Sequence, residues 1–189
     1  MPHSPTIMII RHAEKAKPHK EGVDESGTDD SHSLAVRGWQ RAGALVGLFA
    51  PLQRALPEPR LVRPAHLFAE CADAPDSEPK KSQREEQTLA PLSQVLAMEP
   101  NFNFGRGQEA EAASAAKNCT GPVLIAWEHK SLFKLAGEIT NSTALPQKWP
   151  SDRFDIVLVF RFQAKSGTYS FEQVPQLLLS GDLEAPIAT

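Results

Sequence analysis

Residues Thr6-Ile-Met-Ile-Ile10 run directly into Arg11-His12-Ala13-Glu14-Lys15. The apolar run has no polar face, which predicts a short strand buried on both sides, as in the parallel sheets of α/β proteins. The segment Pro122-Val-Leu-Ile-Ala-Trp127 repeats this pattern and continues into Glu128-His129-Lys130. Ligands of open α/β sheets bind beyond the carboxyl ends of the strands. We therefore expect His12 and His129 to lie at one edge of the sheet, with Arg11 beside them.

Helices are predicted between these strands. An apolar face that recurs at helical spacing indicates a helix over 35–50, and further helices are expected over 86–98, 108–117 and 130–140. Further strands are expected over 65–70, 155–162 and 167–174, the last two as a hairpin. Strands that alternate with helices indicate an α/β fold. The expected architecture is a three-layer α/β/α sandwich with a mostly parallel central sheet and an antiparallel edge, in a single domain over residues 1–189.

The composition argues against several classes of protein. Hydrophobic residues make up 41% and charged residues 23% of the 189 residues, as in an ordinary globular protein. The net charge of −3 leaves no net basic charge to hold a long nucleic acid, and no apolar run approaches the roughly 20 residues of a membrane span. Arg11 ends the first apolar run too early for a secretory signal. Cys71 and Cys119 form no CxxC pair, so a reducing cytoplasm is the expected location.

Two long polar segments, 17–33 and 72–83, are expected to be loops near the site. Long loops in compact domains often act as lids or binding loops. The first of them carries an acidic run, Glu21, Asp24, Glu25, Asp29 and Asp30. If that run folded over the site, it would repel a highly anionic substrate.

Four motifs in this chain resemble those of the histidine phosphatase superfamily, which includes cofactor-dependent phosphoglycerate mutases and phosphohistidine phosphatases. Residues 11–15 resemble its Arg-His-Gly motif. The family's Leu-Thr-x-x-Gly-x-x-Gln-Ala helix start corresponds to residues 34–42, and its Arg-x-x-Gln-Thr motif to Arg84, Gln87 and Thr88. Residues 123–130 stand where the family has strand-Gly-His-Gly. The resemblance covers residues 7 to about 140 and implies a phosphoglycerate mutase-like fold.

The resemblance also implies a mechanism. His12 would be the nucleophile and would carry the phosphoryl group as phosphohistidine until water hydrolyses it. Arg11, Arg84 and a protonated His129 would bind the phosphoryl oxygens, because guanidinium groups match phosphate geometry. No metal and no cofactor is expected, since the positive charges are built into the chain. Taken without the family, Arg84 fits a solvated charge run with Lys80, Lys81, Glu85 and Glu86 equally well.

The proton donor for the leaving group stays open at this point. Glu109 is the first candidate, because it begins a predicted helix after two glycines, and Glu111 and Glu99 are alternatives. Glu14 and Glu128 each lie close to a site histidine and would either donate the proton or orient the rings. Among the other polar residues, Arg37 and Arg41 are expected on the surface of the first helix. His66 is expected to be structural, and His32 to be solvated.

Departures from the family pattern shape the functional expectation. Ala13 and Glu128 replace glycines, and Glu128 would raise the pKa of His129 while opposing an anionic substrate. The chain is short for a mutase, so we expect a small metal-independent phosphatase that acts on phosphomonoesters or phosphohistidine, either a small phosphorylated substrate or a phosphoprotein. One alternative is a non-catalytic module of the same fold that binds phosphorylated ligands. A metallohydrolase that uses His12 and His129 with nearby carboxylates is the third possibility.

Overall fold

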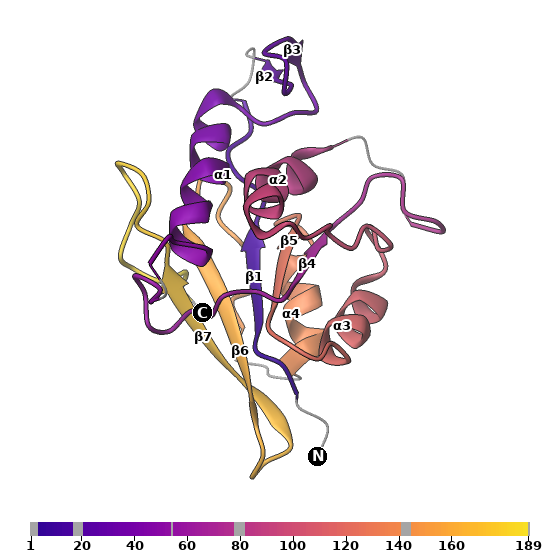
Figure 1. Cartoon of the computed structure of the whole chain (residues 1–189). Coiled ribbons are helices and arrows are strands. Elements are labelled where there is room, and N and C mark those ends of the chain that lie inside the picture. Colours follow the sequence, from indigo (N-terminus) through magenta and orange to yellow (C-terminus); the bar gives the residue numbers. More distant parts are fainter. Residues whose placement is uncertain (1–3, 17–20, 54, 78–81, 141–144, 189) are drawn as a thin grey trace.

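A five-stranded open sheet runs through the protein (Figure 1). The computed structural model describes residues 4–16, 21–53, 55–77, 82–140 and 145–188. The strand order is β4-β5-β1-β6-β7. In chain order the strands of this sheet are β1 (Ile7–Arg11), β4 (His66–Ala69), β5 (Val123–Trp127), β6 (Ile156–Gln163) and β7 (Thr168–Pro175). The predicted strands all form, with ends shifted by one residue or so.

The sheet is mixed. β1 pairs in parallel with β5, and β5 pairs in parallel with β4. β6 is antiparallel to β1, and the β6–β7 hairpin forms one edge. The α/β class and the antiparallel edge are therefore confirmed, and the three parallel strands β4, β5 and β1 form the other side of the sheet.

Four helices flank the sheet. They are α1 (Val36–Phe49), α2 (Arg84–Leu96), α3 (Glu109–Lys117) and α4 (Leu132–Thr140). Side chains alternate between the two faces of a strand, so neighbouring residues of β1 enter different cores. Met8 and Ile10 pack with residues of α1 and α2, whereas Ile7 and Ile9 pack with residues of α3 and α4. This double covering explains why β1 and β5 are apolar throughout.

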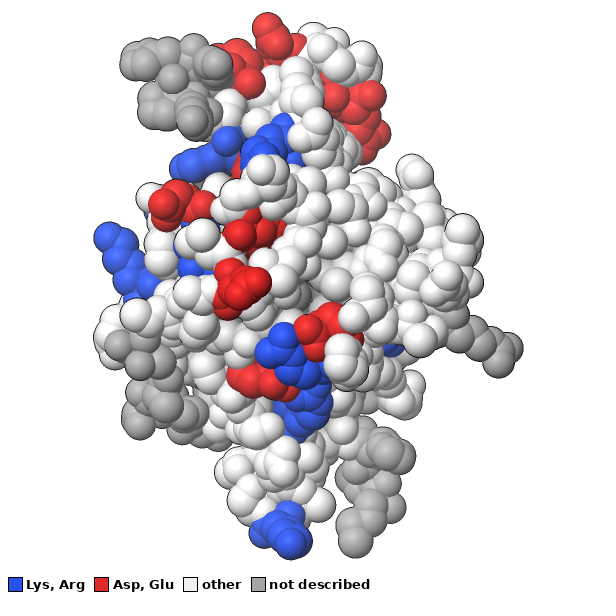
Figure 2. Space-filling model, turned by 90° about the vertical axis from the view of Figure 1, so that its left-hand side faces the viewer, with Lys and Arg blue, Asp and Glu red and all other residues white. Residues whose placement is uncertain are grey.

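A small hairpin interrupts the segment that was expected to be a plain loop. Its strands, β2 (Gly22–Val23) and β3 (Asp29–Asp30), project beyond the carboxyl end of β1 (Figure 1). The indole N–H of Trp39 in α1 donates to the Val23 carbonyl at 2.9 Å and anchors the hairpin. Acidic side chains gather at this end of the molecule (Figure 2). Residues 17–20 and 78–81 of the two expected loops lie outside the described residues.

Candidate functional site

Two neighbouring strands bring the candidate histidines together. In the parallel pairing of β1 with β5, Arg11 stands opposite Trp127, so the next residues leave the sheet side by side. The backbone N–H of His12 donates to the Trp127 carbonyl at 3.3 Å. The His12 and His129 rings meet edge to face, with centroids 6.2 Å apart. The site therefore forms at the carboxyl ends of the strands, where the sequence predicted it.

The surroundings of His12 define its tautomer. His12 is 3% exposed, and its Nδ1 lies 2.7 Å from the Ala13 carbonyl oxygen. A carbonyl only accepts hydrogen bonds, so Nδ1 carries the proton and the lone pair of the neutral ring lies on Nε2. Ala13 is also held through its backbone N–H, which donates to Thr88 Oγ1 at 2.8 Å. The ring is thus oriented by a backbone segment that is itself fixed.

The first turns of α2 fasten this segment and the next loop. Thr88 accepts from Ala13 and donates to the Arg84 carbonyl at 2.6 Å. The Gln87 amide accepts from the Leu34 N–H at 2.9 Å and donates to Ser33 Oγ at 2.8 Å. The Arg-x-x-Gln-Thr spacing thus places both polar side chains where they join α2 to chain segments that lie far away in the sequence.

A buried ion network supports the same segment from α1. Arg41 is 2% exposed and donates from Nε and NH2 to the Glu14 carboxylate at 2.8–3.1 Å. Its guanidinium also pairs with Asp182 near the C-terminus at 2.7 Å. Burial opposes the charged form of Arg41, but the hydrogen bonds that Arg41 donates to Asp182 and Glu14 raise its pKa above the ordinary value. The surface position expected for Arg41 is wrong, whereas Arg37 is exposed and touches Glu14 at 3.2 Å.

A cavity of about 290 Å³ opens beside His12. Cationic side chains outnumber carboxylates around it by four to two, and three histidines complete its ionisable lining. The lining residues are His12, Lys15, His32, Ser82, Arg84, Glu85, Arg106, Glu128, His129 and Lys130. Burial, followed by the charges of Arg11, Arg84 and Lys130, lowers the pKa of Lys15, as a concentration of positive charge requires.

Two arginines of this cavity are held by oxygen atoms. Arg84 begins α2 and donates from Nε to the Ser33 carbonyl at 3.0 Å, and from NH2 to the Ser31 carbonyl. Burial lowers the pKa of Arg84. Arg106, from the turn before α3, forms an ion pair with Glu128. The structure therefore places Arg84 at the pocket. Arg106, which the sequence did not single out, neutralises the charge of Glu128.

Arg11 lies beside the pocket rather than in its lining. Its NH1 donates to the carbonyls of Pro150, Ser151 and Arg153 at 2.9–3.0 Å. Its guanidinium carbon lies 3.8 Å from the centroid of the Phe154 ring, which also contacts His12. Burial lowers the pKa of Arg11 to about 10. Nε and NH2 are buried and have no hydrogen-bond partner among the described residues.

His129 is neutral at physiological pH in this structure. Burial, together with the charge of Arg11, lowers its pKa to about 4 and outweighs the opposing effect of Glu128. Its Nδ1 is buried without a hydrogen-bond partner in the described part of the chain. The expectation of a protonated ring, with its pKa raised by Glu128, is therefore wrong for the structure without a ligand, because desolvation dominates.

The proton-donor candidates are scattered. Glu109 is 1% exposed and is not part of the pocket lining; it pairs with Lys134 at 2.7 Å and accepts from the Gly107 N–H at 3.1 Å. Burial raises its pKa, but these partners hold the pKa below the ordinary value. Glu99 and Glu111 are exposed, and Glu14 is bound by the arginines of α1. Of the named candidates only Glu128 lines the pocket.

Besides Arg106, three residues of the site were not singled out by sequence reasoning. Glu85 lines the pocket and is fully buried, although its charged neighbours suggested a solvated run. His32 lines the pocket from the base of the β2–β3 hairpin. Glu70 follows β4, and its carboxylate accepts from the Glu128 N–H at 2.7 Å. The strand-end argument applied to β4 would have found Glu70, whereas no local pattern marks Glu85.

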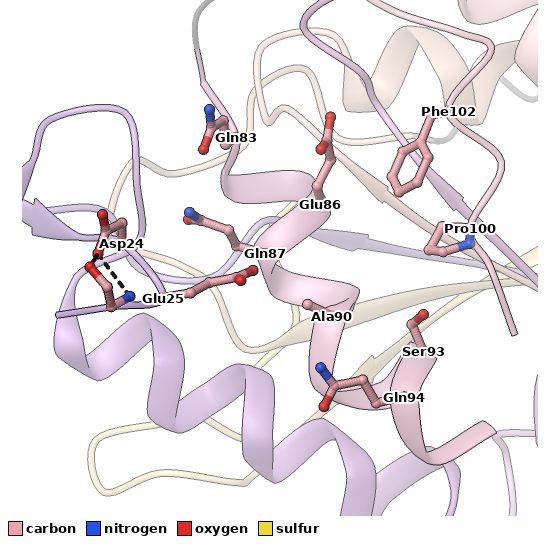
Figure 3. Close-up of a pocket in the computed structure, with 11 residues that line it drawn as sticks. Asp24, Glu25, Gln83, Glu86, Gln87, Ala90, Ser93, Gln94, Pro100 and Phe102 are labelled. Atoms are coloured by element: carbon pink, nitrogen blue, oxygen red, sulfur yellow. Dashed lines mark hydrogen bonds between the residues drawn. The ribbon is translucent and has the colours of Figure 1, made fainter. Parts of the chain in front are cut away.

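Another groove, of about 650 Å³, lies on the other side of α2 (Figure 3). Carboxylates and amides line it, among them Asp24, Glu25 and Gln94, and its described lining includes no histidine, cysteine, lysine or arginine. It therefore holds neither a strong nucleophile nor cations for an anionic ligand. The nucleophile and the cations meet in the His12 pocket.

Comparison of the chain with protein-family models and with curated proteins gives no match. Within the described residues, no group of three His, Cys, Asp or Glu side chains is arranged to hold a metal ion. In the same part of the chain, no helix has the length and apolarity needed to cross a membrane.

Proposed function

We propose that this protein is a metal-independent phosphatase that passes the phosphoryl group through a phosphohistidine on His12. The observation that carries the proposal is the buried His12 ring, whose Nδ1 is bound to the Ala13 carbonyl at 2.7 Å in a cationic pocket. A neutral imidazole with its lone pair on Nε2 attacks phosphorus without first losing a proton. The resemblance of the motifs to the histidine phosphatase superfamily, with its phosphoglycerate mutase-like form of the α/β fold, supports the same conclusion.

The groups around His12 suit a phosphoryl group. Phosphoryl transfer depends on in-line positioning and on stabilising the charge of the peripheral oxygens. Arg84, Arg106, Lys15 and Lys130 supply that charge. Arg11 lies beside the pocket and has two buried nitrogen donors, Nε and NH2, without a hydrogen-bond partner among the described residues, which is rare in folded proteins.

The reaction follows from this arrangement in two steps. In the first, the Nε2 lone pair of His12 forms a bond to phosphorus, and the P–O bond to the leaving group breaks. In the second, water attacks phosphorus and the N–P bond breaks, which returns the electron pair to Nε2 and releases phosphate. A bound phosphoryl group would favour protonation of the neutral His129, because an adjacent negative charge stabilises the imidazolium.

Substrates of modest charge fit the surroundings best. The pocket is small, and the acidic β2–β3 hairpin projects from the same end of the molecule (Figures 1 and 2). Its carboxylates repel long polyanions such as nucleic acids. A small phosphomonoester, or a phosphorylated side chain presented by another protein, avoids this repulsion.

The test is hydrolysis of p-nitrophenyl phosphate in the presence of a chelator, with wild type, His12→Ala and His66→Ala. His66 is the matched control, since it is half-buried at the start of β4, away from the pocket. We expect chelator-resistant turnover in wild type and His66→Ala, and its loss in His12→Ala. Turnover that survives in His12→Ala would refute the phosphohistidine route. Turnover abolished by the chelator would point to a metallohydrolase instead.

One observation favours a second function, a module that binds phosphorylated ligands without turnover. The guanidinium of Arg11 is tied to three backbone carbonyls instead of lining the pocket. Such a pocket would retain its other cations but would lack one that stabilises the transition state. Inorganic phosphate would then raise the melting temperature while no tested phosphate ester is hydrolysed.

A further inference from the structure

A cleft of about 870 Å³ lies beside the His12 pocket, which measures about 290 Å³. Lys15 lines both cavities. Phe154 lines the cleft, and the centroid of its ring lies 6.1 Å from that of His12. A phosphorylated molecule bound at His12 therefore has this cleft, here called the α1 cleft, directly next to it.

Three segments form most of the walls of the α1 cleft: the start of α1, residues 151–155 and residues 181–183. The segment that follows β7 runs beside α1 (Figure 1), where Arg41 pairs with Asp182 at 2.7 Å. The Leu183 N–H donates to Asp155 Oδ2 at 2.7 Å and joins the other two walls. Because these contacts fix the walls to one another, the cleft is already formed before anything binds.

Most charges of the α1 cleft neutralise one another. Three arginines and three carboxylates of its lining form ion pairs among themselves: Arg37, Arg41, Arg153, Glu14, Asp155 and Asp182. The other described charges of the lining are Lys15, which the cleft shares with the His12 pocket, and the exposed carboxylates of Glu21 and Asp152. The unbalanced charge therefore changes sign, from positive around His12 to negative in the cleft.

Asp152 is the carboxylate of the cleft that lies near the reacting group. It is exposed and forms no hydrogen bond or ion pair with the part of the chain that the structure describes. Burial lowers the pKa of Arg11, and the charge of Asp152 is among those that oppose this shift, so Asp152 lies close to the residue before His12. A carboxylate at this place repels a simple phosphate ester, but it attracts a substrate that carries a cation next to its phosphoryl group.

The α1 cleft also exposes apolar surface. Val36 and Leu183 are 63% and 50% exposed, and both line the cleft together with the half-buried Phe154. Single exposed apolar side chains are common, but apolar surface gathered in a cleft with a polar rim is typical of an interaction site. The occupant of this cleft should therefore combine apolar and cationic groups.

We propose that the α1 cleft binds a polypeptide whose phosphorylated side chain enters the His12 pocket, and that this polypeptide carries basic and apolar side chains next to the phosphorylated residue. The inference rests on the proposed function and favours phosphoproteins over small phosphomonoesters as substrates. An extended polypeptide advances by about 3.3 Å per residue, so one short segment brings all three groups to the site. A small phosphomonoester would leave the cleft empty.

The test is the binding of fluorescein-labelled pentapeptides, followed by fluorescence anisotropy. Each peptide has a phosphonate analogue of phosphoserine in its centre, in which a methylene group replaces the ester oxygen so that nothing is hydrolysed. The first peptide has arginine on both sides of the centre and leucine at both ends. The second has glutamate in place of arginine, and the third has serine in place of leucine. At low ionic strength we expect the first peptide to bind about tenfold more tightly than the second and about threefold more tightly than the third.

Two variants connect these preferences to the α1 cleft. Asp152→Lys should reduce the preference for arginine over glutamate by about fivefold or more, because it reverses the charge that faces the basic side chain. Leu183→Ser should remove most of the preference for leucine over serine. Each readout is a ratio of two affinities within one variant, so a general change in the pocket cancels. Glu138→Lys is the matched control, since Glu138 is an exposed carboxylate on α4 outside the lining of both cavities, and it should keep both ratios.

Several results would overturn the inference. They are equal binding of the arginine and glutamate peptides, ratios that Asp152→Lys leaves unchanged, undetectable binding of all the peptides, and equal binding of a peptide with plain serine in its centre. Free 2-amino-4-phosphonobutyrate that binds as tightly as the first peptide would assign the site to a small molecule instead. Hydrolysis of p-nitrophenyl phosphate in any of these cases would leave the proposed function intact. Selective peptide binding by a protein that hydrolyses no phosphate ester would instead support the cleft and refute the phosphatase.

Discussion

Replacing Arg41 by methionine should destabilise the fold far more than removal of an exposed arginine. Arg41 is 2% exposed and joins Glu14 of the loop after β1, Gln176 and Asp182 of the C-terminal segment. Methionine fills most of the volume but leaves Asp182 without its cation and Glu14 with only the exposed Arg37. Breaking a buried ion pair from one side costs about 3–5 kcal/mol. For a chain of this size, that corresponds to a drop of roughly 6–20 °C in melting temperature.

The loss of stability in Arg41→Met should depend on pH in a definite direction. Burial raises the pKa of Asp182, but hydrogen bonds from Arg41 and from the Leu179 N–H hold it below the ordinary value. In wild type, Asp182 therefore stabilises the fold above the unfolded carboxyl pKa of about 4, and this contribution is lost as pH falls below it. Without Arg41, burial dominates and the sign reverses. The difference between wild type and Arg41→Met should therefore shrink as the pH is lowered from 7 towards 4.

Urea unfolding at pH 7 and at pH 4.5, analysed by linear extrapolation, measures both effects. Arg60→Met is the matched control, because Arg60 forms an ion pair with Glu58 at 2.7 Å but is 46% exposed. Exposed pairs contribute about 1 kcal/mol or less. Equal losses in the two variants, or an Arg41→Met loss that does not shrink at pH 4.5, would contradict the buried network as the reason.

Three further predictions concern single groups. Thr88→Val removes the acceptor of the buried Ala13 N–H and should lower the free energy of unfolding in urea by about 1–3 kcal/mol. Thr88→Ser keeps the hydroxyl and should lower it less. Equal losses in the two variants would mean that the hydroxyl is dispensable. Gly38→Ala places a Cβ against the Glu14 carbonyl oxygen and should destabilise the fold. Gly43→Ala is the control, because Gly43 faces open space on the same helix, and it should stabilise the fold by about 0.5–1 kcal/mol. A Gly38→Ala protein as stable as wild type would show that α1 does not need this close approach. In the absence of phosphate, the His129 ring should titrate near pH 4 when followed by NMR. The free energy of unfolding should therefore decrease as pH falls from about 6.5 towards 4, and it should decrease more in wild type than in His129→Asn. Titration of the ring near pH 6.5 would rule out the desolvated environment.

Local patterns predicted the elements well. The apolar runs at 6–10 and 122–127 became β1 and β5, and the helical periodicity at 35–50 became α1. Strand and helix periodicities depend on neighbours a few residues away, so they can be read along the chain. The two-residue strands of the β2–β3 hairpin were missed, because their polar residues carry no periodic signal.

The positions of individual site residues were predicted correctly for some residues and wrongly for others. His12 and His129 meet as expected, because the position of a strand end is a local property. Arg84 lies at the pocket, whereas Arg11 turns to carbonyls some 140 positions away and Glu109 turns to Lys134. Side-chain direction depends on which distant partners the fold supplies, and no pattern around Arg11 or Glu109 encodes these partners.

The sequence by itself determined the order and type of the main elements and the strand ends that carry His12 and His129. Only the tertiary structure decided the ionisation and burial of the charged groups. It buried Arg41 against Glu14 and Asp182, desolvated His129 so that its pKa lies near 4, and placed Glu85 in the pocket. The reason is physical: periodicity is local, whereas desolvation and charge pairing depend on all the segments that fold around a group.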